Sequence, residues 1–507
     1  MKKSRILMEL RPAFDGYAGI PQDTRNTYKL LAENNNIELT GHLLSSKEGT
    51  NGYPFHSFFK KKKHRLIERQ SGYVLALSSG EKESKLFFLK SQRVLGLIAF
   101  VFSRVLDHLI AITPIVGSNR MKLYEIEYKY FSDYIWRNVF SKSLSAKDVN
   151  SISKTRFFGQ SSSWSGMSQG IYVGLPFQRI NTKDHDYYIS QTPLPARVSD
   201  NTQLIVRYHD AIPMFMPHTI SDALPHKEVH YKSLLRNIKD GALFVCNSEA
   251  TKLELLNMFP SIGDRISVVH CCISNIFYPD PISEKEQLIS LVINRYSYGN
   301  VLGVDRYKDR DRFMKMIKSE FLLNDEYLLA IGTMEPRKNY NTLLSAWIRL
   351  RSTTNRKLKL VIVGNMGWHS LDLLNAMMPS MFDADLYLLE KVPISELRKL
   401  YSSALATVVP SYGEGFSYSG IESMKCGGIV LASDIGVHKE IYKEGATYFN
   451  PYSTAELHTE IEALLESSDK EKEEKRSKGF EVASLYSEAA IGKQWSDYID
   501  NLQSDAV

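Results

Sequence analysis

Two carboxylates, Glu414 and Glu422, stand eight positions apart in the stretch SYGEGFSYSGIES (411–423). Glycine and serine fill much of the space between them, and such residues let a backbone approach a ligand closely. An apolar run precedes the stretch and a helical pattern follows it, so Ser417 or Ser419 can cap the helix. The unpaired N–H groups at the start of that helix suit a phosphate.

This arrangement predicts roles for both acids. Glu422, about one turn inside the helix, can grip paired ribose hydroxyls, and Glu414 can reach the hydroxyls of a second sugar. The stretch therefore suits a sugar–diphosphate–ribose molecule. Taken alone, it also fits a surface loop with two solvated acids.

A second motif, with adjacent cations at Arg337 and Lys338, is expected to act together with the stretch 411–423. They lie in GTMEPRKNYNTLL (332–344), after an apolar run and directly before a helical pattern. A forked donor and a point charge together neutralise a diphosphate, and arginine and lysine supply them. An exposed basic turn is the simpler interpretation of the pair alone. However, both loops follow strands of one expected sheet and open on the same edge, so together they predict a diphosphate site.

The elements that position these loops are clearest in the C-terminal half, where short β-branched and aliphatic runs alternate with segments of helical spacing. The expected strands are 327–332, 358–364, 386–390, 404–409, 428–433 and 446–449. Near-continuous apolar strands between amphipathic helices are typical of βαβ units around a buried parallel sheet. We therefore predict a complete Rossmann-like domain.

The N-terminal half shows fewer such runs. The expected elements are strands at 4–10, 203–210, 242–248 and 265–270 and a helix over 20–34. The segment at about 44–200 is too long and irregular for an ordinary crossover connection between strands. We interpret it as an insertion that includes an exposed serine-rich loop at 159–170.

The predicted fold class is α/β, with two Rossmann-like domains facing each other across a cleft and a large insertion in the first. The expected boundaries are an N-terminal domain (1–285), a linker (286–325), a C-terminal domain (326–480) and a C-terminal helix (481–507) that packs back on the first domain. Ligands of such folds bind at the carboxyl ends of the strands, so both loops are expected in the cleft.

On these residues the sequence resembles the retaining nucleotide-sugar glycosyltransferases of the family-4 group, which have the two-domain GT-B fold. The similarity is good over 327–450 and weaker towards the N-terminus. The matching motifs there are GTMEPRKNYNTLL, LVIVG, VPISELRKLYSSA, Glu414–Glu422, SMKCGGIVLASDIGVHKEI and GATYFNP. The weaker matches are VRYHDAIPMF (206–215), VCNSEATKLEL (245–255) and RPAFDGYAGIPQDTR (11–25).

The resemblance implies a role for each matched residue. Arg337 and Lys338 would hold the donor diphosphate, Glu422 would bind the ribose and Glu414 the transferred sugar. His209 would face the reacting sugar, although it can also be interpreted as a buried strand-end histidine paired with Asp210. The expected catalytic residues are His209, Arg337, Lys338 and Glu414. Further donor contacts are expected from Gly19, Gly332, Val392, Pro393, Phe416, Ser417 and Tyr418.

The chain departs from the family beside the sugar pocket. The family usually has Gly, Leu and Pro where this sequence has Ser417, Tyr418 and Ser419. Backbone donors survive those changes, so the phosphate site is expected to survive, whereas sugar selectivity does not transfer.

The expected function is retaining transfer of a hexose from a nucleoside-diphosphate sugar to a lipid-linked or polysaccharide acceptor in cell-surface glycan synthesis. The N-terminal domain would bind the acceptor, and the expected donor is GDP-mannose, as in bacterial polysaccharide enzymes of this kind. Fixed cations and amides can stabilise the departing diphosphate, so no metal and no cofactor are expected. The DHD tripeptide (184–186) lies away from any expected strand–loop site.

Two alternatives share the architecture. One is a sugar-nucleotide epimerase or hydrolase, which would act with no acceptor present. The other is an inactive partner subunit that binds a sugar nucleotide, and the presence of both cations with both carboxylates argues against it.

The composition indicates the class of protein and limits the kinds of partner that we expect. A chain with 43% hydrophobic and 24% charged residues is ordinary for a soluble globular protein. Four cysteines without a CxxC pair fit a reducing compartment, and we expect a cytoplasmic location. No signature of nucleic-acid binding is present, so no nucleic-acid partner is expected.

The first 150 residues are basic, with 24 Lys/Arg against 14 Asp/Glu. The excess peaks at KKKKHR (60–65), and an apolar stretch interrupted by Arg104 and Asp107 follows at 94–112. A cationic patch beside an apolar helical face is typical of an interfacial anchor. We therefore predict peripheral association with the anionic inner face of the cytoplasmic membrane, and a buried helix is the alternative.

Overall fold

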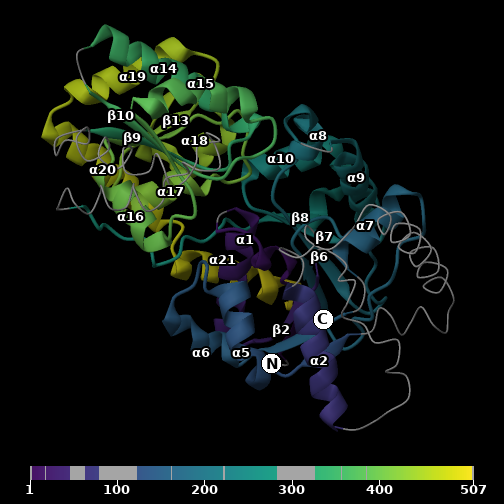
Figure 1. The fold of residues 1–507 in the computed structure, drawn as a ribbon. Coiled ribbons are helices and arrows are strands. Elements are labelled where there is room, and N and C mark those ends of the chain that lie inside the picture. The colour runs from purple at the N-terminus through teal and green to yellow at the C-terminus, as the bar shows by residue number, and fades with distance from the viewer. Residues whose placement is uncertain are drawn as a thin grey trace, which may run out of the picture.

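The computed structural model describes residues 3–17, 19–45, 63–78, 123–160, 163–220, 223–282, 326–354, 357–383 and 385–504. These residues form two α/β domains, each built on its own mostly parallel sheet (Figure 1). The predicted fold class of two Rossmann-like domains is confirmed.

The sheet of the N-terminal domain has eight strands in the order β3-β4-β2-β1-β5-β6-β7-β8, and only β3 runs antiparallel to its neighbour. The strands are β1 (Ser4–Glu9), β2 (Ile37–Leu43), β3 (Tyr124–Ile126), β4 (Arg156–Gly159), β5 (Tyr187–Ser190), β6 (Gln203–Tyr208), β7 (Leu243–Cys246) and β8 (Ile266–Val268). Alternate residues of β1 point to opposite faces, so Ile6 and Met8 join one apolar cluster and Leu7 another. Both faces of this sheet are therefore covered.

The helices of this domain include α1 (Ile20–Glu33), α2 (Lys63–Ser78), α5 (Tyr128–Ile135), α6 (Val149–Ser153), α7 (Trp164–Tyr172), α8 (Ile212–Phe215), α9 (Ala223–Lys239) and α10 (Glu249–Met258). Of these, α7 overlaps the serine-rich segment predicted as an exposed loop. Ser163 caps α7 by accepting a hydrogen bond from the Gly166 N–H, which is why a serine-rich segment begins a helix here.

The structure does not confirm an insertion over 44–200, because β3, β4 and β5 lie within that range. In particular, β5 pairs with β1 on one side and β6 on the other, near the middle of the sheet. The sequences of β4 and β5, RFFG and YYIS, are short and mixed in polarity, so they lack the aliphatic run of a typical buried strand.

The C-terminal domain holds a six-stranded parallel sheet in the order β11-β10-β9-β12-β13-β14. The strands are β9 (Tyr327–Ile331), β10 (Lys359–Val363), β11 (Leu386–Leu389), β12 (Ala406–Val409), β13 (Val430–Ser433) and β14 (Ala446–Phe449). Each predicted strand of this half is present. The helices between them are α14 (Tyr340–Thr353), α15 (Leu371–Phe382), α16 (Ile394–Ser403), α17 (Tyr418–Lys425) and α18 (Gly436–Tyr442), and α19 (Thr454–Glu466) follows β14.

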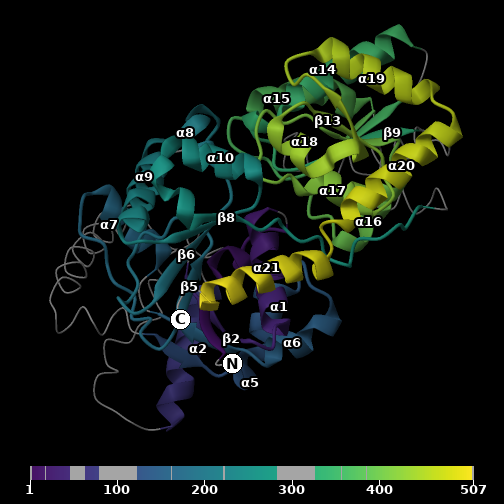
Figure 2. The same ribbon diagram turned by 180° about the vertical axis from the view of Figure 1, so that it is seen from behind.

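Two further helices follow α19. Helix α20 (Asp469–Ser484) packs on α17, and α21 (Glu488–Ser504) returns to the N-terminal domain, where it lies against α1 (Figure 2). Lys29 of α1 bonds to Glu488 at 2.5 Å, and Asn34 bonds to Ser496 at 2.9 Å. The last helix therefore ties the chain back to its beginning.

Three of the predicted features lie largely outside the described residues. They are the apolar stretch 94–112, the linker 286–325, and the basic run 60–65, of which only 63–65 are described, at the start of α2. Among the helices that the structure describes, none is long and apolar enough to cross a membrane.

Candidate active site

The loop between β12 and α17 carries Glu414 to the carboxyl edge of the second sheet. Ser417, just before the helix, has a left-handed backbone with φ of 65°. Tyr442 donates its hydroxyl to the carbonyl and hydroxyl oxygens of Ser417, each at 2.7 Å, and the His438 ring lies 3.2 Å from the same hydroxyl. The Ser417 side chain therefore fixes the strained turn. It does not cap α17, although the sequence had suggested Ser417 or Ser419 as the cap.

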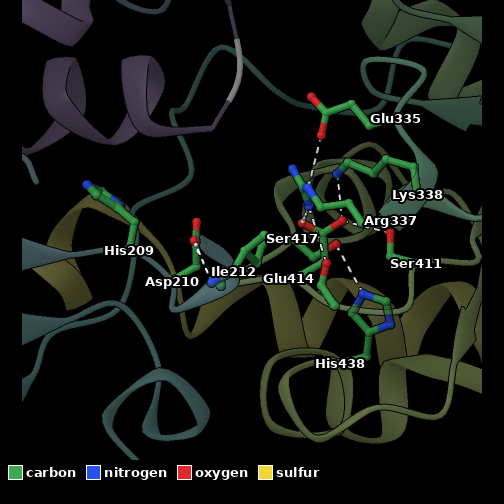
Figure 3. A network of polar contacts seen from close by, with 12 residues as sticks. His209, Asp210, Ile212, Glu335, Arg337, Lys338, Ser411, Glu414, Ser417 and His438 are labelled. Carbon is green, nitrogen blue, oxygen red and sulfur yellow. Dashed lines mark hydrogen bonds and ion pairs between the residues drawn. The ribbon is translucent and has the colours of Figure 1, made fainter. Parts of the chain in front are cut away.

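Arg337 and Lys338 meet Glu414 at the same edge. They occupy a short 3-10 turn after β9, and both donate to the Glu414 carboxylate, at 2.7 Å from Arg337 and 2.6 Å from Lys338 (Figure 3). Ser411 adds a hydrogen bond of 2.7 Å to that carboxylate, and Glu335 accepts one of 3.0 Å from Arg337. The structure thus brings the two predicted cations and the first predicted carboxylate into one cluster, here called the cation cluster.

Charge in the cation cluster is balanced internally. Although burial alone would raise it, the pKa of Glu414 lies well below its usual range, because Lys338 and Arg337 stabilise the carboxylate. Burial lowers the pKa of Lys338, while Glu414 opposes this shift. An anionic ligand placed on the two cations would have to compete with the Glu414 carboxylate.

Glu422 lies apart from the cation cluster, in a buried position between the domains. Its carboxylate accepts hydrogen bonds of 2.9 Å from the Gln22 amide and the Tyr401 hydroxyl. Gln22 lies in the first turn of α1, so this bond joins the two domains. Burial raises the pKa of Glu422, which has hydrogen-bond donors but, within the described ranges, no ion-pair partner.

His209 follows β6 and reaches the cleft through its backbone. A Cβ atom at Gly415 would clash with the His209 carbonyl oxygen, so the glycine is required by a close approach of the two domains. The ring is 6% exposed, its Nε2 atom has no hydrogen-bond partner among the described residues, and burial lowers its pKa to about 4. At neutral pH the ring is therefore uncharged.

The carboxylate nearest to the His209 ring is Asp23 of α1, at 3.9 Å, and not the sequence neighbour Asp210. The Asp210 carboxylate instead accepts a hydrogen bond from the Ile212 N–H (Figure 3). Asp23 also forms a buried ion pair with Arg207 at 2.8 Å. Its contact with the Tyr418 hydroxyl, at 3.4 Å, crosses between the domains.

Comparison with known proteins identifies the C-terminal half. Residues 311–479 match the protein-family model described as "Glycosyl transferases group 1". The chain carries a group 1 glycosyl transferase domain. The resemblance inferred from the sequence is thereby confirmed for this domain.

A curated relative extends the similarity. O-antigen chain mannosyltransferase B of Escherichia coli is 27% identical over 271 residues, which are 53% of this chain and 62% of that protein. The chain therefore matches less than two thirds of the length of this relative.

Solved structures resemble the whole chain. Sucrose-phosphate synthase from Thermosynechococcus elongatus superposes with a TM-score of 0.56 at 13% identity, over 99% of this chain and 100% of that one. The structure described as "Trehalose-6-phosphate from E. coli bound with UDP-2-fluoro glucose" gives 0.51 at 12% identity, over 97% and 98%. At these identities the likeness concerns the fold, which is GT-B.

Other predicted residues of the glycosyl transferase domain are largely buried or belong to its turns. Val392, Phe416 and Tyr418 are at most 7% exposed and belong to the apolar core. Pro393 precedes α16. Gly332 has φ of 147°, a value that favours glycine, and its carbonyl accepts the Tyr340 hydroxyl.

On the opposite wall of the cleft, Gly19 begins α1 with φ of 69°. The structure therefore places Gly19 one turn from Gln22, at the end of the helix that faces the glycosyl transferase domain.

Sequence reasoning missed the residues that join the two domains. Gln22 and Asp23 of α1 reach α17, and Ser248 donates to the Gly415 carbonyl at 2.8 Å. Arg207 had a weak sequence signal, because it is a charged residue inside the apolar run QLIVRY. The others depend on the closure of the two domains, which no local pattern encodes.

Proposed function

We propose that the chain is a retaining glycosyltransferase that transfers a hexose from a nucleoside-diphosphate sugar during the synthesis of a surface glycan. The observation that carries this proposal is the convergence of Arg337, Lys338 and Glu414 at the cleft edge of the glycosyl transferase domain. A forked cation and a point cation side by side suit a diphosphate.

The Glu414 carboxylate takes the place of the phosphate oxygens in the free protein. When a donor binds, its diphosphate displaces Glu414 from both cations. The freed carboxylate then accepts hydrogen bonds from hydroxyls of the transferred sugar. Donor binding and sugar recognition are in this way linked through one side chain.

Transfer follows from electrostatic stabilisation of the leaving group. The acceptor hydroxyl forms the new C–O bond on the face from which the phosphate oxygen departs, and that phosphate oxygen takes the hydroxyl proton. Arg337 and Lys338 stabilise the charge that develops on the diphosphate as its bond to the sugar breaks. His209, neutral at pH 7, contributes shape and its carbonyl oxygen beside Gly415.

The ribose of the donor is assigned to Glu422. Two ribose hydroxyls would replace the Gln22 amide as donors to its carboxylate, while Tyr401 keeps the second oxygen in place.

The identities of sugar and acceptor rest on the relatives. The E. coli relative is named a mannosyltransferase of the O-antigen chain, which supports mannose and a polysaccharide or lipid-linked acceptor. The fold neighbour bound with UDP-2-fluoro glucose supports a nucleotide-sugar donor. We retain GDP-mannose as the proposed donor. We also retain an anionic membrane surface as a proposed docking site, which flotation with acidic and neutral liposomes would test.

Thermal shift with GDP-mannose, GDP-glucose, UDP-glucose and UDP-galactose tests the proposal. A donor at a hundredfold excess over Kd raises the free energy of unfolding by about 2.7 kcal/mol. The shift should vanish in Arg337→Ala and persist in Arg349→Ala, which changes an exposed arginine of α14. If no nucleotide sugar shifts the melting of the folded protein, the proposal is wrong.

Metal independence is tested on the same material. Among the described residues, no group of three or more His, Cys, Asp or Glu side chains could hold a metal ion, and Asp186 of the DHD tripeptide pairs with Arg5 at 2.6 Å. We expect turnover to survive EDTA. Activity that disappears with EDTA and returns with Mn²⁺ would contradict this part of the proposal.

A further inference from the structure

A cavity of about 240 Å³ lies on the N-terminal side of the Glu414 loop, between the two domains. One wall comes from α8 and α10, and the other from residues 412–414 and 435–437. Glu414 belongs both to this wall and to the cation cluster. The cavity therefore adjoins the place proposed for the transferred sugar.

Aromatic and sulfur-containing side chains make part of the lining. Phe215 is 52% exposed, and Met216 fits so closely over Gly413 that a Cβ there would lie 2.7 Å from the sulfur. Tyr412 stacks on Tyr452, with ring centroids 5.0 Å apart, and Tyr452 is 81% exposed. An apolar surface thus runs from the cavity to the outside of the molecule.

A carboxylate faces the cavity from the N-terminal domain. Glu254 of α10 is half-buried, and within the described part of the chain it makes no ion pair. Burial, with the nearby Asp210 carboxylate, raises the pKa of Glu254 to about 7. A carboxylate without a cation retains acceptor positions for ligand hydroxyl groups.

The lining favours a neutral ligand over an anionic one. Among the described residues that line the cavity are Glu254 and Glu414 but no lysine or arginine, and the adjacent cations Arg337 and Lys338 already pair with Glu414. A neutral molecule with hydroxyl groups along its edge and an apolar face fits this combination of carboxylates and aromatic rings. A pyranose ring has both features.

We propose that this cavity is the acceptor subsite, in which Phe215 and Tyr412 pack on the apolar face of a neutral glycan and Glu254 accepts hydrogen bonds from its hydroxyls. The inference rests on the proposed function and adds to it the chemical class of the acceptor end. Tyr452 would extend the contact to the next sugar of a chain. Glu254 thereby becomes a residue that determines acceptor specificity.

Saturation-transfer NMR tests the subsite with α-mannotriose and maltotriose as probes, each in the presence of saturating GDP or UDP. At least one trisaccharide should receive saturation in the wild type. Phe215→Ala and Glu254→Gln should each weaken its apparent affinity about tenfold, while the thermal shift produced by the nucleotide is unchanged. Matched controls are Phe480→Ala, at an exposed residue of α20, and Glu228→Gln, at a partly exposed residue of α9, and both should leave the two readouts intact.

Three outcomes separate the hypotheses. If nucleotide binds and neither trisaccharide receives saturation, the subsite is overturned and the proposed function stands. If a trisaccharide binds equally well to both cavity variants, it sits elsewhere and the subsite is again overturned. If the folded protein binds no nucleotide and no nucleotide sugar, the proposed function itself fails.

Discussion

Two charged clusters, one in each domain, are built differently. In the cation cluster, the Arg337 and Lys338 side chains are 20% and 17% exposed, and both form ion pairs with the Glu414 carboxylate. In the N-terminal domain, the Arg207 and Asp23 side chains are 0% and 1% exposed. Arg207 also donates to the carbonyl oxygens of Cys246, at the end of the neighbouring strand β7, and of Val269, directly after β8.

The difference lies in whether a partner can be exchanged. Breaking the Asp23–Arg207 pair leaves a buried charge with no access to water, so this pair is a fixed part of the fold. The Glu414 side chain lies on a loop at the cleft, and in the proposed mechanism an anionic ligand takes over its contacts while the freed carboxylate turns to sugar hydroxyls. Similar ion pairs therefore have different roles in our interpretation: one stabilises the N-terminal domain, and the other is the proposed ligand site.

The largest expected effect is on the fixed side. Asp23→Asn should lower the free energy of unfolding by about 3–5 kcal/mol, because it leaves the Arg207 charge buried and unpaired. Urea denaturation measures this, with Asp133→Asn in an exposed ion pair as the control. A loss below about 1 kcal/mol would mean that the pair is not the fixed element described here.

On the exchangeable side, Lys338→Ala should leave the melting temperature nearly unchanged and reduce donor affinity and transfer rate together. A charge-assisted contact contributes about 1.5–3 kcal/mol, or roughly ten- to a hundredfold. Lys439→Ala, in an exposed ion pair with Asp434, is the control in a steady-state assay of nucleoside diphosphate release. Wild-type kinetics in Lys338→Ala would remove the diphosphate site.

Smaller effects are expected from changing the two carboxylates, Glu414 and Glu422, and the two changes should affect different measurements. Glu414→Gln should slow transfer about tenfold or more without weakening the binding of the free nucleoside diphosphate, since Glu414 serves the sugar and only competes with the diphosphate for the two cations. Glu422→Gln should weaken nucleotide binding about tenfold, about 1.4 kcal/mol, since Glu422 serves the ribose. Calorimetry with the nucleotide and an initial-rate assay give both numbers, and equal effects on the two readouts would reverse our placement.

The smallest expected effect depends on pH. Burial lowers the pKa of His209 to about 4, so the unfolded chain binds a proton between pH 6.5 and 4 that the folded protein does not. The contribution of His209 to the free energy of unfolding is therefore fully present above pH 6.5. It decreases as the pH is lowered, by about 1 kcal/mol between pH 6.5 and 5.5. His209→Gln should lose that much less over this interval than the wild type, and parallel pH profiles would contradict the neutral buried ring.

The C-terminal domain could be predicted from the sequence because its strands are covered on both faces. Runs such as KLVIV of β10 are buried along their whole length, so the apolar signal is continuous. The position of Arg337 and Lys338 beside Glu414 followed from the same rule, since parallel strands bring their carboxyl ends to one edge.

The N-terminal domain resisted prediction for two physical reasons. Its strands β4 and β5 are mixed in polarity, and their stability comes from neighbours in the sheet rather than from their own composition. One partner of Glu422 and the carboxylate beside His209 come from α1, distant in sequence and brought near only by tertiary closure. Local patterns can specify which residue carries a charge, but not which distant residue will satisfy it.

The return of α21 to α1 has a consequence for biosynthesis. Ile491, Trp495 and Ile499 of α21 are at most 1% exposed and belong to the same apolar cluster as the face of β1 that includes Ile6 and Met8. The ribosome makes α1 early and α21 after the entire second sheet. The N-terminal domain must therefore wait with part of its apolar surface uncovered, and the two domains complete their folding together rather than in the order of translation.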